Sequence, residues 1–251
     1  MKRIAVCSAL ALSLSGCKLF YGAPVPMHSI VYADQSGPAK CLLVLLPGLG
    51  DADKAFEDNR FISMVREQKL SVDLVAADAT LGYYLRGMVV ERLDADVVAK
   101  TRGRYAATWL VGVSMGGMGS LLYARDHGAE ARGLLLLAPY LGDDKLVEEI
   151  RAAGGPLRWK GPAREAVTAD NYQRQAWGWL AEVISRRQAG PEIYLGYGSK
   201  DKSARNHGVL AGALPPDHVY RDEGDHDWGP WRSLFAQFLT SSAFARECGG
   251  T

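Results

Sequence analysis

Six runs of apolar residues recur along the chain, at 41–47, 72–78, 107–113, 131–139, 192–197 and, more weakly, 218–223. Within these runs the apolar residues follow one another and do not alternate with polar ones. A strand that is buried on both faces of its sheet has this pattern, because both of its sides contact the core. The pattern therefore predicts strands of a sheet that is covered by helices on both faces.

Stretches with helical spacing separate these runs, at about 54–67, 86–101, 116–127, 143–153, 171–187, 203–212 and 230–240. Alternating strands and helices predict an α/β fold with a doubly wound, mostly parallel sheet. We expect one domain over 40–251, with a small helical lid inserted at about 140–190. Residues 17–39 are expected to form a tether and one or two edge strands.

The first residues have a different character from this domain. A basic "MKR" precedes the apolar "IAVCSALALSL", which is too short to span a bilayer, and "LSGC" ends at Cys17. The segment resembles a bacterial lipoprotein signal peptide, which implies cleavage after residue 16 and attachment of lipid to Cys17. An ordinary secretory signal or a buried apolar segment is the alternative. Lys18 favours the outer membrane, facing the periplasm, as the anchoring site in the cell envelope.

Composition and cysteine usage narrow the possible functions. The 251 residues are 48% hydrophobic with a formal net charge of +1, and no basic run is interleaved with aromatic residues, so nucleic acid is an unexpected partner. The spacing of histidines and cysteines resembles no metal site, and we expect no metal. In an exported protein Cys41 and Cys248 can form a disulfide, although the tail from Arg246 could also be a disordered end.

Ser114 is the first candidate for chemistry. "GVSMG" follows the apolar run at 107–113 and precedes a predicted helix, and it matches the G-x-S-x-G pattern of a serine at a strained turn between strand and helix. A glycine-rich helix start with a capping serine is the simpler alternative. The context of strand and helix favours a nucleophile.

A nucleophilic serine needs a base and an acid at other strand ends. His226 follows the last predicted strand, and Asp201 follows the strand before it, so the order along the chain is serine, acid, histidine. Asp201 could instead cap the helix after it. Asp143 and Asp144 are the rival acids, but we expect them to cap the helix near Lys145.

The other histidines are expected in surface or capping positions: His28, His127, His207 and His218. Two backbone amides are candidates for the oxyanion hole, that of Met115 after the nucleophile and that of Leu49 in the glycine-containing loop "PGLGD". Three tryptophans in the lid could line an acyl pocket or simply pack the lid on the body: Trp159, Trp177 and Trp179.

The motifs "LLPGLGD", "GVSMGG", "GSKD" and "GDHDWGPW" resemble the α/β-hydrolase superfamily, from about Lys40 to Phe238. "SMGG" with "HDWxxW" is similar to esterase-D-like and tributyrin-esterase-like carboxylesterases. The resemblance implies Ser114 as nucleophile, His226 as base and Asp201 as acid, with the amides of Leu49 and Met115 as oxyanion hole. Many relatives have histidine-glycine where this chain has Pro47-Gly48.

The expected activity is hydrolysis of small to medium acyl esters without a cofactor, because no long hydrophobic lid is visible in the sequence. Two alternatives stay open. The same apparatus could pass the acyl group to an alcohol or glycan of the cell envelope. The chain could also be a lipoprotein adaptor that keeps the fold without the chemistry.

Overall fold

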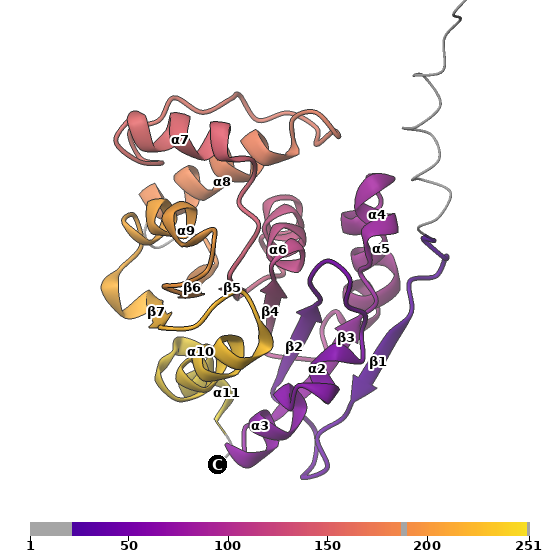
Figure 1. The fold of residues 1–251 in the computed structure, drawn as a ribbon. Coiled ribbons are helices and arrows are strands. Elements are labelled where there is room, and N and C mark those ends of the chain that lie inside the picture. Colours follow the sequence, from indigo (N-terminus) through magenta and orange to yellow (C-terminus); the bar gives the residue numbers. More distant parts are fainter. Residues whose placement is uncertain (1–21, 187–189, 250–251) are drawn as a thin grey trace, which may run out of the picture.

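The computed structural model describes residues 22–186 and 190–249 (Figure 1). In this part of the chain one sheet has the strand order β1-β3-β2-β4-β5-β6-β7. β1 runs antiparallel to β3, and the other neighbouring strands are parallel, which confirms the predicted fold class. The strands span Ser29–Tyr32 (β1), Cys41–Leu46 (β2), Val72–Ala77 (β3), Ala107–Val113 (β4), Gly133–Leu137 (β5), Glu192–Gly198 (β6) and Val219–Asp222 (β7).

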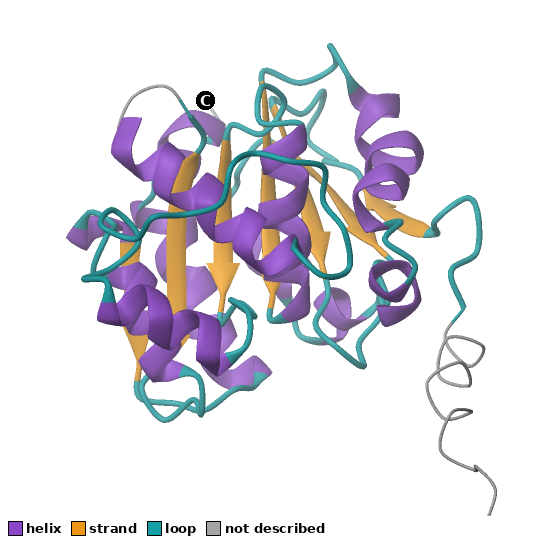
Figure 2. Cartoon of the chain, turned by 90° about the horizontal axis from the view of Figure 1, so that it is seen from above, coloured by secondary structure: helices purple, strands orange, loops and turns teal. Residues whose placement is uncertain are grey.

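Helices cover both faces of the sheet (Figure 2). β2 shows why, since all six of its residues are buried and successive side chains enter opposite cores. One face carries α4 (Leu81–Leu85), α5 (Val89–Leu93), α6 (Met115–Asp126), α7 (Asp144–Ala152), α8 (Tyr172–Arg186) and α9 (Ala204–Ala211). The other face carries α2 (Ala55–Asp58), α3 (Phe61–Glu67), α10 (Trp228–Ser241) and α11 (Ala243–Cys248).

The helix predicted over 86–101 is broken into different types of helical turn. After α5 come a π-helical turn at Asp94–Val98 and a 3-10 turn at Ala99–Thr101. Leu93, Val97 and Val98 are buried, and their spacing suits an α-helix and a π-helical turn equally well. The sequence pattern therefore located the buried face but not the type of helix.

The structure also divides one predicted helix and contains two helices that were not predicted. The helix predicted over 54–67 is divided into α2 and α3 at Arg60, whose φ of 70° is incompatible with a continuous helix. α4 and α11 were not predicted, because each is only five or six residues long and offers little periodicity.

A disulfide joins Cys41 at the start of β2 to Cys248 at the end of α11, with Cα atoms 5.7 Å apart. This confirms the predicted pairing. Both cysteines are fully buried, and the Ser71 amide donates to the Cys248 carbonyl oxygen at 2.9 Å. α11 is thereby fixed to the end of the sheet where β2 begins.

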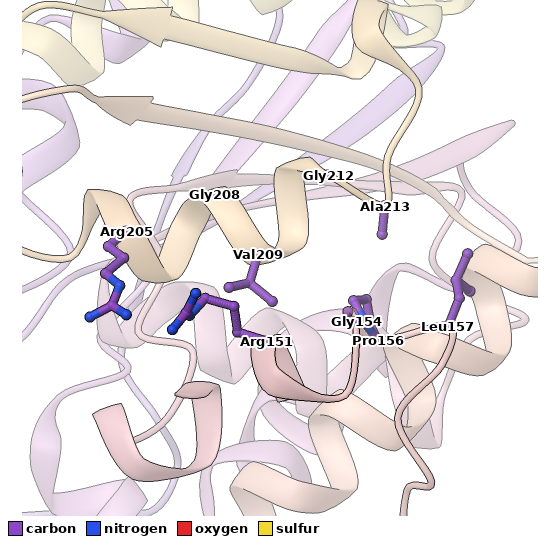
Figure 3. Close-up of a pocket in the computed structure, with 10 residues that line it drawn as sticks. Arg151, Gly154, Pro156, Leu157, Arg205, Gly208, Val209, Gly212 and Ala213 are labelled. Atoms are coloured by element: carbon purple, nitrogen blue, oxygen red, sulfur yellow. The ribbon is translucent and has the colours of Figure 1, made fainter. Parts of the chain in front are cut away.

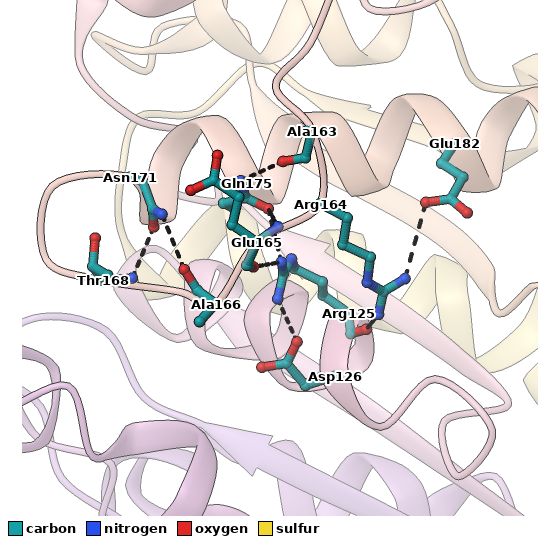
Figure 4. Close-up of polar contacts among 10 residues, drawn as sticks. All are labelled: Arg125, Asp126, Ala163, Arg164, Glu165, Ala166, Thr168, Asn171, Gln175 and Glu182. Carbon is teal, nitrogen blue, oxygen red and sulfur yellow. Dashed lines mark hydrogen bonds and ion pairs between the residues drawn. The ribbon is translucent and has the colours of Figure 1, made fainter.

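The segment at 140–190, predicted as a lid, contains α7 and α8 and packs on the end of α6. The buried guanidinium of Arg125 on α6 donates to the Glu165 carbonyl oxygen and to Gln175 Oε1, while Gln175 Nε2 donates to the Ala163 carbonyl oxygen (Figure 4). The three tryptophans are buried here, and Trp177 Nε1 donates to the Leu141 carbonyl oxygen at 2.6 Å. They pack this segment onto the body of the protein.

The predicted signal peptide and Cys17 lie outside the described residues. Within residues 22–186 and 190–249, no helix combines the length and apolar character needed to cross a bilayer.

Candidate active site

Ser114 occupies a strained turn between β4 and α6. Its φ of 50° and ψ of −112° lie outside the regions that residues with a side chain ordinarily adopt. Small neighbours make the turn possible: a Cβ on Gly116 would lie 2.2 Å from the Leu46 carbonyl oxygen, and one on Gly112 would lie 2.3 Å from the Gly116 carbonyl oxygen. The glycines of the G-x-S-x-G pattern are thus required because α6 begins in direct contact with the sheet.

The structure brings the three side chains of the predicted triad together at the carboxyl ends of β4, β6 and β7. His226 Nε2 lies 3.1 Å from Ser114 Oγ, and His226 Nδ1 lies 2.6 Å from Asp201 Oδ2. An ionised carboxylate can only accept, so Nδ1 carries a hydrogen in this arrangement and Nε2 presents its lone pair to the serine hydroxyl. The geometry is suited to removal of the hydroxyl proton by the imidazole.

The loops that carry the acid and the histidine are bound to each other. The Lys200 amide donates to the Gly224 carbonyl oxygen at 3.0 Å, and the Ser199 amide donates to the Asp222 carbonyl oxygen at 2.7 Å. The indole of Trp231 meets the His226 ring edge to face, with centroids 5.1 Å apart. These contacts restrict the orientation of the imidazole.

The Asp201 carboxylate is buried but well provided with donors. Burial acts to raise its pKa, yet the hydrogen bonds from His226 and from the Ser203 amide outweigh burial, so the pKa of Asp201 is lowered. The carboxylate is therefore ionised at neutral pH and can stabilise a positive charge on His226.

The rival acids have other partners. Asp143 is the N-cap of α7 and accepts from the Leu146 amide at 2.9 Å, which confirms its predicted capping role. Asp144 lies in the first turn of the same helix and accepts from Asn206 Nδ2 at 2.7 Å.

Leu49 and Met115, the candidates for the oxyanion hole, belong to two segments that meet at Ser114. Met115 is the first residue of α6, where backbone amides have no partner within the helix. Gly48 packs against the turn, because a Cβ there would lie 3.5 Å from Ser114 Cβ, and Leu49 follows directly. Both segments thus lie beside the nucleophile, and the two amides stay candidates for the oxyanion hole.

The loop with Leu49 is also connected to the histidine side of the site, through two residues that sequence reasoning missed. Asp51 lies close to Trp228, the first residue of α10, and burial raises the pKa of Asp51. The two residues are far apart in the sequence, and no local signal announces their contact.

The expectation of a surface or capping role is wrong for His207, which is fully buried on α9. A signal was available, since Leu210 and Ala211 follow at helical spacing and share its buried face. The remaining histidines are at least partly exposed: His28 pairs with Asp53, His127 stacks on Tyr123, and His218 contacts the Ile193 carbonyl oxygen.

Three of the cavities in the described part of the chain have linings that do not include Ser114, Asp201 or His226. One cavity of about 310 Å³ lies between α7 and α9. Its lining includes Arg151, Arg205 and several glycines (Figure 3). Both arginines pair with Glu148. The triad therefore forms no part of the lining of these cavities.

One group of metal-ligating side chains forms far from Ser114, at the other end of α6. Asp94, His127 and Glu130 have ligand atoms within 4.8 Å of one another. Arg102 donates to Asp94 Oδ1 at 2.6 Å and to Glu130 Oε1 at 2.8 Å, so both carboxylates already have a cationic partner. Sequence reasoning missed this group because the acids and the histidine come from different elements.

Comparison with known proteins agrees with the fold. The family model described as "Putative esterase" matches residues 75–241, and the chain belongs to this esterase family of hydrolases. No curated protein matches the chain.

Solved structures with the same fold include several hydrolases. S-formylglutathione hydrolase from Staphylococcus aureus is 15% identical, with 85% of this chain and 89% of that chain covered and a TM-score of 0.58. A ferulic acid esterase is 14% identical, with coverage of 87% and 92% and a TM-score of 0.60. S-formylglutathione hydrolase from Agrobacterium tumefaciens is 13% identical, with coverage of 89% and 90% and a TM-score of 0.55. At these identities the similarity extends to the fold alone.

Proposed function

We propose that the protein is a serine esterase that cleaves small to medium carboxylic acyl esters through an acyl-enzyme on Ser114. The observation that carries this proposal is the position of His226, hydrogen bonded to Ser114 Oγ on one side and to the Asp201 carboxylate on the other. Membership of the esterase family supports the reaction class.

In the first half of the reaction, His226 Nε2 takes the hydroxyl proton while Ser114 Oγ attacks the carbonyl carbon of the ester. The carbonyl oxygen becomes an oxyanion, which the amides of Leu49 and Met115 stabilise by hydrogen bonds. Asp201 stabilises the imidazolium. The bond to the alcohol then breaks, and His226 returns the proton to the leaving alkoxide.

In the second half, water attacks the acyl carbon and gives its proton to His226. The second oxyanion collapses with release of the carboxylic acid, and the proton returns to Ser114 Oγ. The helix start at Met115 adds positive potential at the place where the negative charge develops in both halves.

The substrate size rests on the segment at 140–190. Its tryptophans are buried against the body, and Arg125 binds it to α6. These contacts favour a fixed segment over a large hydrophobic lid. A small or medium ester suits such a site better than a triglyceride droplet.

Labelling with a fluorophosphonate tests the proposed nucleophile. Wild-type protein should label and should hydrolyse 4-nitrophenyl butyrate, and Ser114→Ala should do neither while keeping the same circular dichroism spectrum. A folded wild type that neither labels nor hydrolyses any ester would favour an adaptor. Formation of new esters in the presence of a competing alcohol would favour an acyltransferase.

We also propose that the protein is anchored in the cell envelope by lipid on Cys17, on the strength of the "LSGC" box after an apolar segment. Cys17→Ser should release the protein from the membrane fraction or leave the signal peptide uncut. Normal cleavage with full membrane retention would contradict the anchor.

A further inference from the structure

His207 is a buried histidine with one clear hydrogen bond. Its side chain has no exposed surface, and Nε2 lies 3.0 Å from the Pro139 carbonyl oxygen. A carbonyl oxygen can only accept, so the hydrogen is on Nε2. Nδ1 is buried and has no hydrogen-bond partner among the described residues, and the ring packs against Tyr197 at a centroid distance of 5.3 Å. Burial lowers the pKa of His207, which keeps the ring neutral.

Pro139 belongs to the short segment that holds the backbone of Ser114 in place. The Ser114 amide donates to the Leu137 carbonyl oxygen at 2.9 Å, and the Tyr140 amide donates to the Ser114 carbonyl oxygen at 2.8 Å. Between them Ala138 has a φ of 43°, a strained value for a residue with a side chain. The end of β5 and the segment after it therefore bind both the amide and the carbonyl oxygen of the strained Ser114.

The same segment also contacts the start of α6. A Cβ on Gly117 would lie 2.7 Å from Pro139 Cβ, so no side chain fits between them. Any movement of Pro139 would be transmitted to Ser114 through the neighbouring Tyr140 amide. The hydrogen bond from His207 restrains this movement from the far side of the segment.

The helix that carries His207 begins at the acid of the site. The Ala204 amide donates to the Asp201 carbonyl oxygen at 2.8 Å, and the His207 amide donates to the Ser203 carbonyl oxygen at 3.0 Å. The Ser203 amide in turn binds Asp201 Oδ1 at 2.7 Å. The start of α9 thus binds Asp201 through the Ser203 and Ala204 amides. The same helix binds Pro139, next to the segment that holds Ser114, through the His207 ring.

We propose that His207 is a positioning residue, which fixes Ser114 relative to Asp201 and His226 by donating a hydrogen bond to Pro139. This inference rests on the proposed esterase function. It assigns the buried histidine to the alignment of the nucleophile and gives it no contact with substrate.

The test compares variants that keep or lose the donor at the position of Nε2. His207→Gln can place an amide nitrogen there, whereas His207→Asn is too short and His207→Phe has no donor. With 4-nitrophenyl butyrate we expect kcat to fall roughly tenfold or more in the Asn and Phe variants, with KM unchanged, because misplacement of a reacting group lowers the rate and not the binding. His207→Gln should restore most of the wild-type kcat.

His218 provides a matched control at the opposite end of β6. Its Nδ1 lies 3.0 Å from the Ile193 carbonyl oxygen and its ring stacks on Tyr194, so His218→Phe removes a similar bond at a distance from Ser114. We expect this variant to lose stability without loss of kcat. If His207→Phe does not fold, the comparison of Gln with Asn still decides the matter.

The outcomes separate this inference from the esterase proposal. Full kcat in His207→Asn and His207→Phe, equal losses in Gln and Asn, or an equal loss in His218→Phe would overturn the role of His207 alone. Wild-type protein without hydrolysis that depends on Ser114 would overturn the proposed function and the role of His207 with it.

Discussion

His226 Nδ1 lies 2.6 Å from Asp201 Oδ2, across a turn, a helix and a strand that separate the two residues by 25 positions. The Ser203 amide donates to the other carboxylate oxygen of Asp201, which fixes the orientation of the carboxylate. This arrangement sets the tautomer of His226, as the proposed role of Asp201 requires.

Asp201→Asn should lower kcat by about 10² to 10⁴, because the amide can hold the ring in the wrong tautomer and cannot stabilise its positive charge. Asp143→Asn is the matched control, since that carboxylate caps α7 and such a cap contributes about 1 kcal/mol of stability. Ester hydrolysis would be measured for both variants and for Asp144→Asn. A collapse of kcat in either control, with near-normal turnover in Asp201→Asn, would move the acid to the earlier strand.

The lowered pKa of Asp201 has a consequence for stability in acid. A carboxyl whose folded pKa lies below its unfolded value of about 3.9 stabilises the folded state above that pH, and the contribution is lost as the pH falls through the folded pKa. Urea unfolding of wild type and Asp201→Asn should therefore show a constant difference in unfolding free energy down to about pH 5, which shrinks below it. A difference that grows on acidification would contradict the sign of the shift.

The close contact at Gly116 predicts a strong effect of one methyl group. Gly116→Ala would place a Cβ 2.2 Å from the Leu46 carbonyl oxygen, so the start of α6 must move. We expect a loss of stability on the order of 1–3 kcal/mol and at least roughly a tenfold loss of kcat from displacement of Ser114.

Gly208→Ala is the control for this substitution. Apart from its chain neighbours and the backbone of its own helix, no atom of the described residues lies within 4 Å of a Cβ at Gly208, which is inside α9. Alanine there should therefore raise stability by up to about 1 kcal/mol through helix propensity. Thermal unfolding and kcat would be measured for both variants. Equal behaviour of the two would show that the contact at Gly116 is unimportant.

The disulfide predicts a separation of stability from activity. Cys41 and Cys248 lie at the amino-terminal edge of the sheet, opposite the edge that carries Ser114, and they close a loop of 207 residues. The double variant Cys41→Ser and Cys248→Ser should lose about 2–5 kcal/mol of stability, which corresponds to a fall in Tm of roughly 5–15 °C.

At 25 °C this double variant should keep the wild-type kcat, because Cys41 lies at the start of β2 while Ser114 follows the end of the neighbouring parallel strand β4. Alkylation with and without prior reduction provides the control, since wild type should gain alkyl groups on the two cysteines only after reduction. Identical masses under both conditions would contradict the bond.

Much of the fold was predictable because buried parallel strands are continuous apolar runs, and β2 to β7 all lie within one or two residues of the expected ranges. The triad could be predicted for a related reason. Each of its residues, Ser114, Asp201 and His226, follows a recognisable strand at the edge of the sheet where ligands bind. The local sequence thus identified both the strands and the candidate residues that follow them.

The features that were missed depend on contacts between distant segments. Asp51 lies close to Trp228, and His207 is hydrogen bonded to Pro139. In each case the two residues come from different elements, and no local pattern predicts the partner. The φ of 70° at Arg60 likewise has no signal in the sequence, because the surrounding residues have ordinary helical spacing.

The most direct test of the account is to trap the acyl-enzyme. Wild-type protein mixed with 4-nitrophenyl butyrate and quenched in acid within the first turnover should carry one butyryl group, located by peptide mass spectrometry on Ser114, and should release a burst of nitrophenol. His226→Ala should accumulate the adduct far more slowly, and Ser114→Ala should carry none. Hydrolysis at the wild-type rate in Ser114→Ala, or an acyl group found on another residue of an active wild type, would contradict the account.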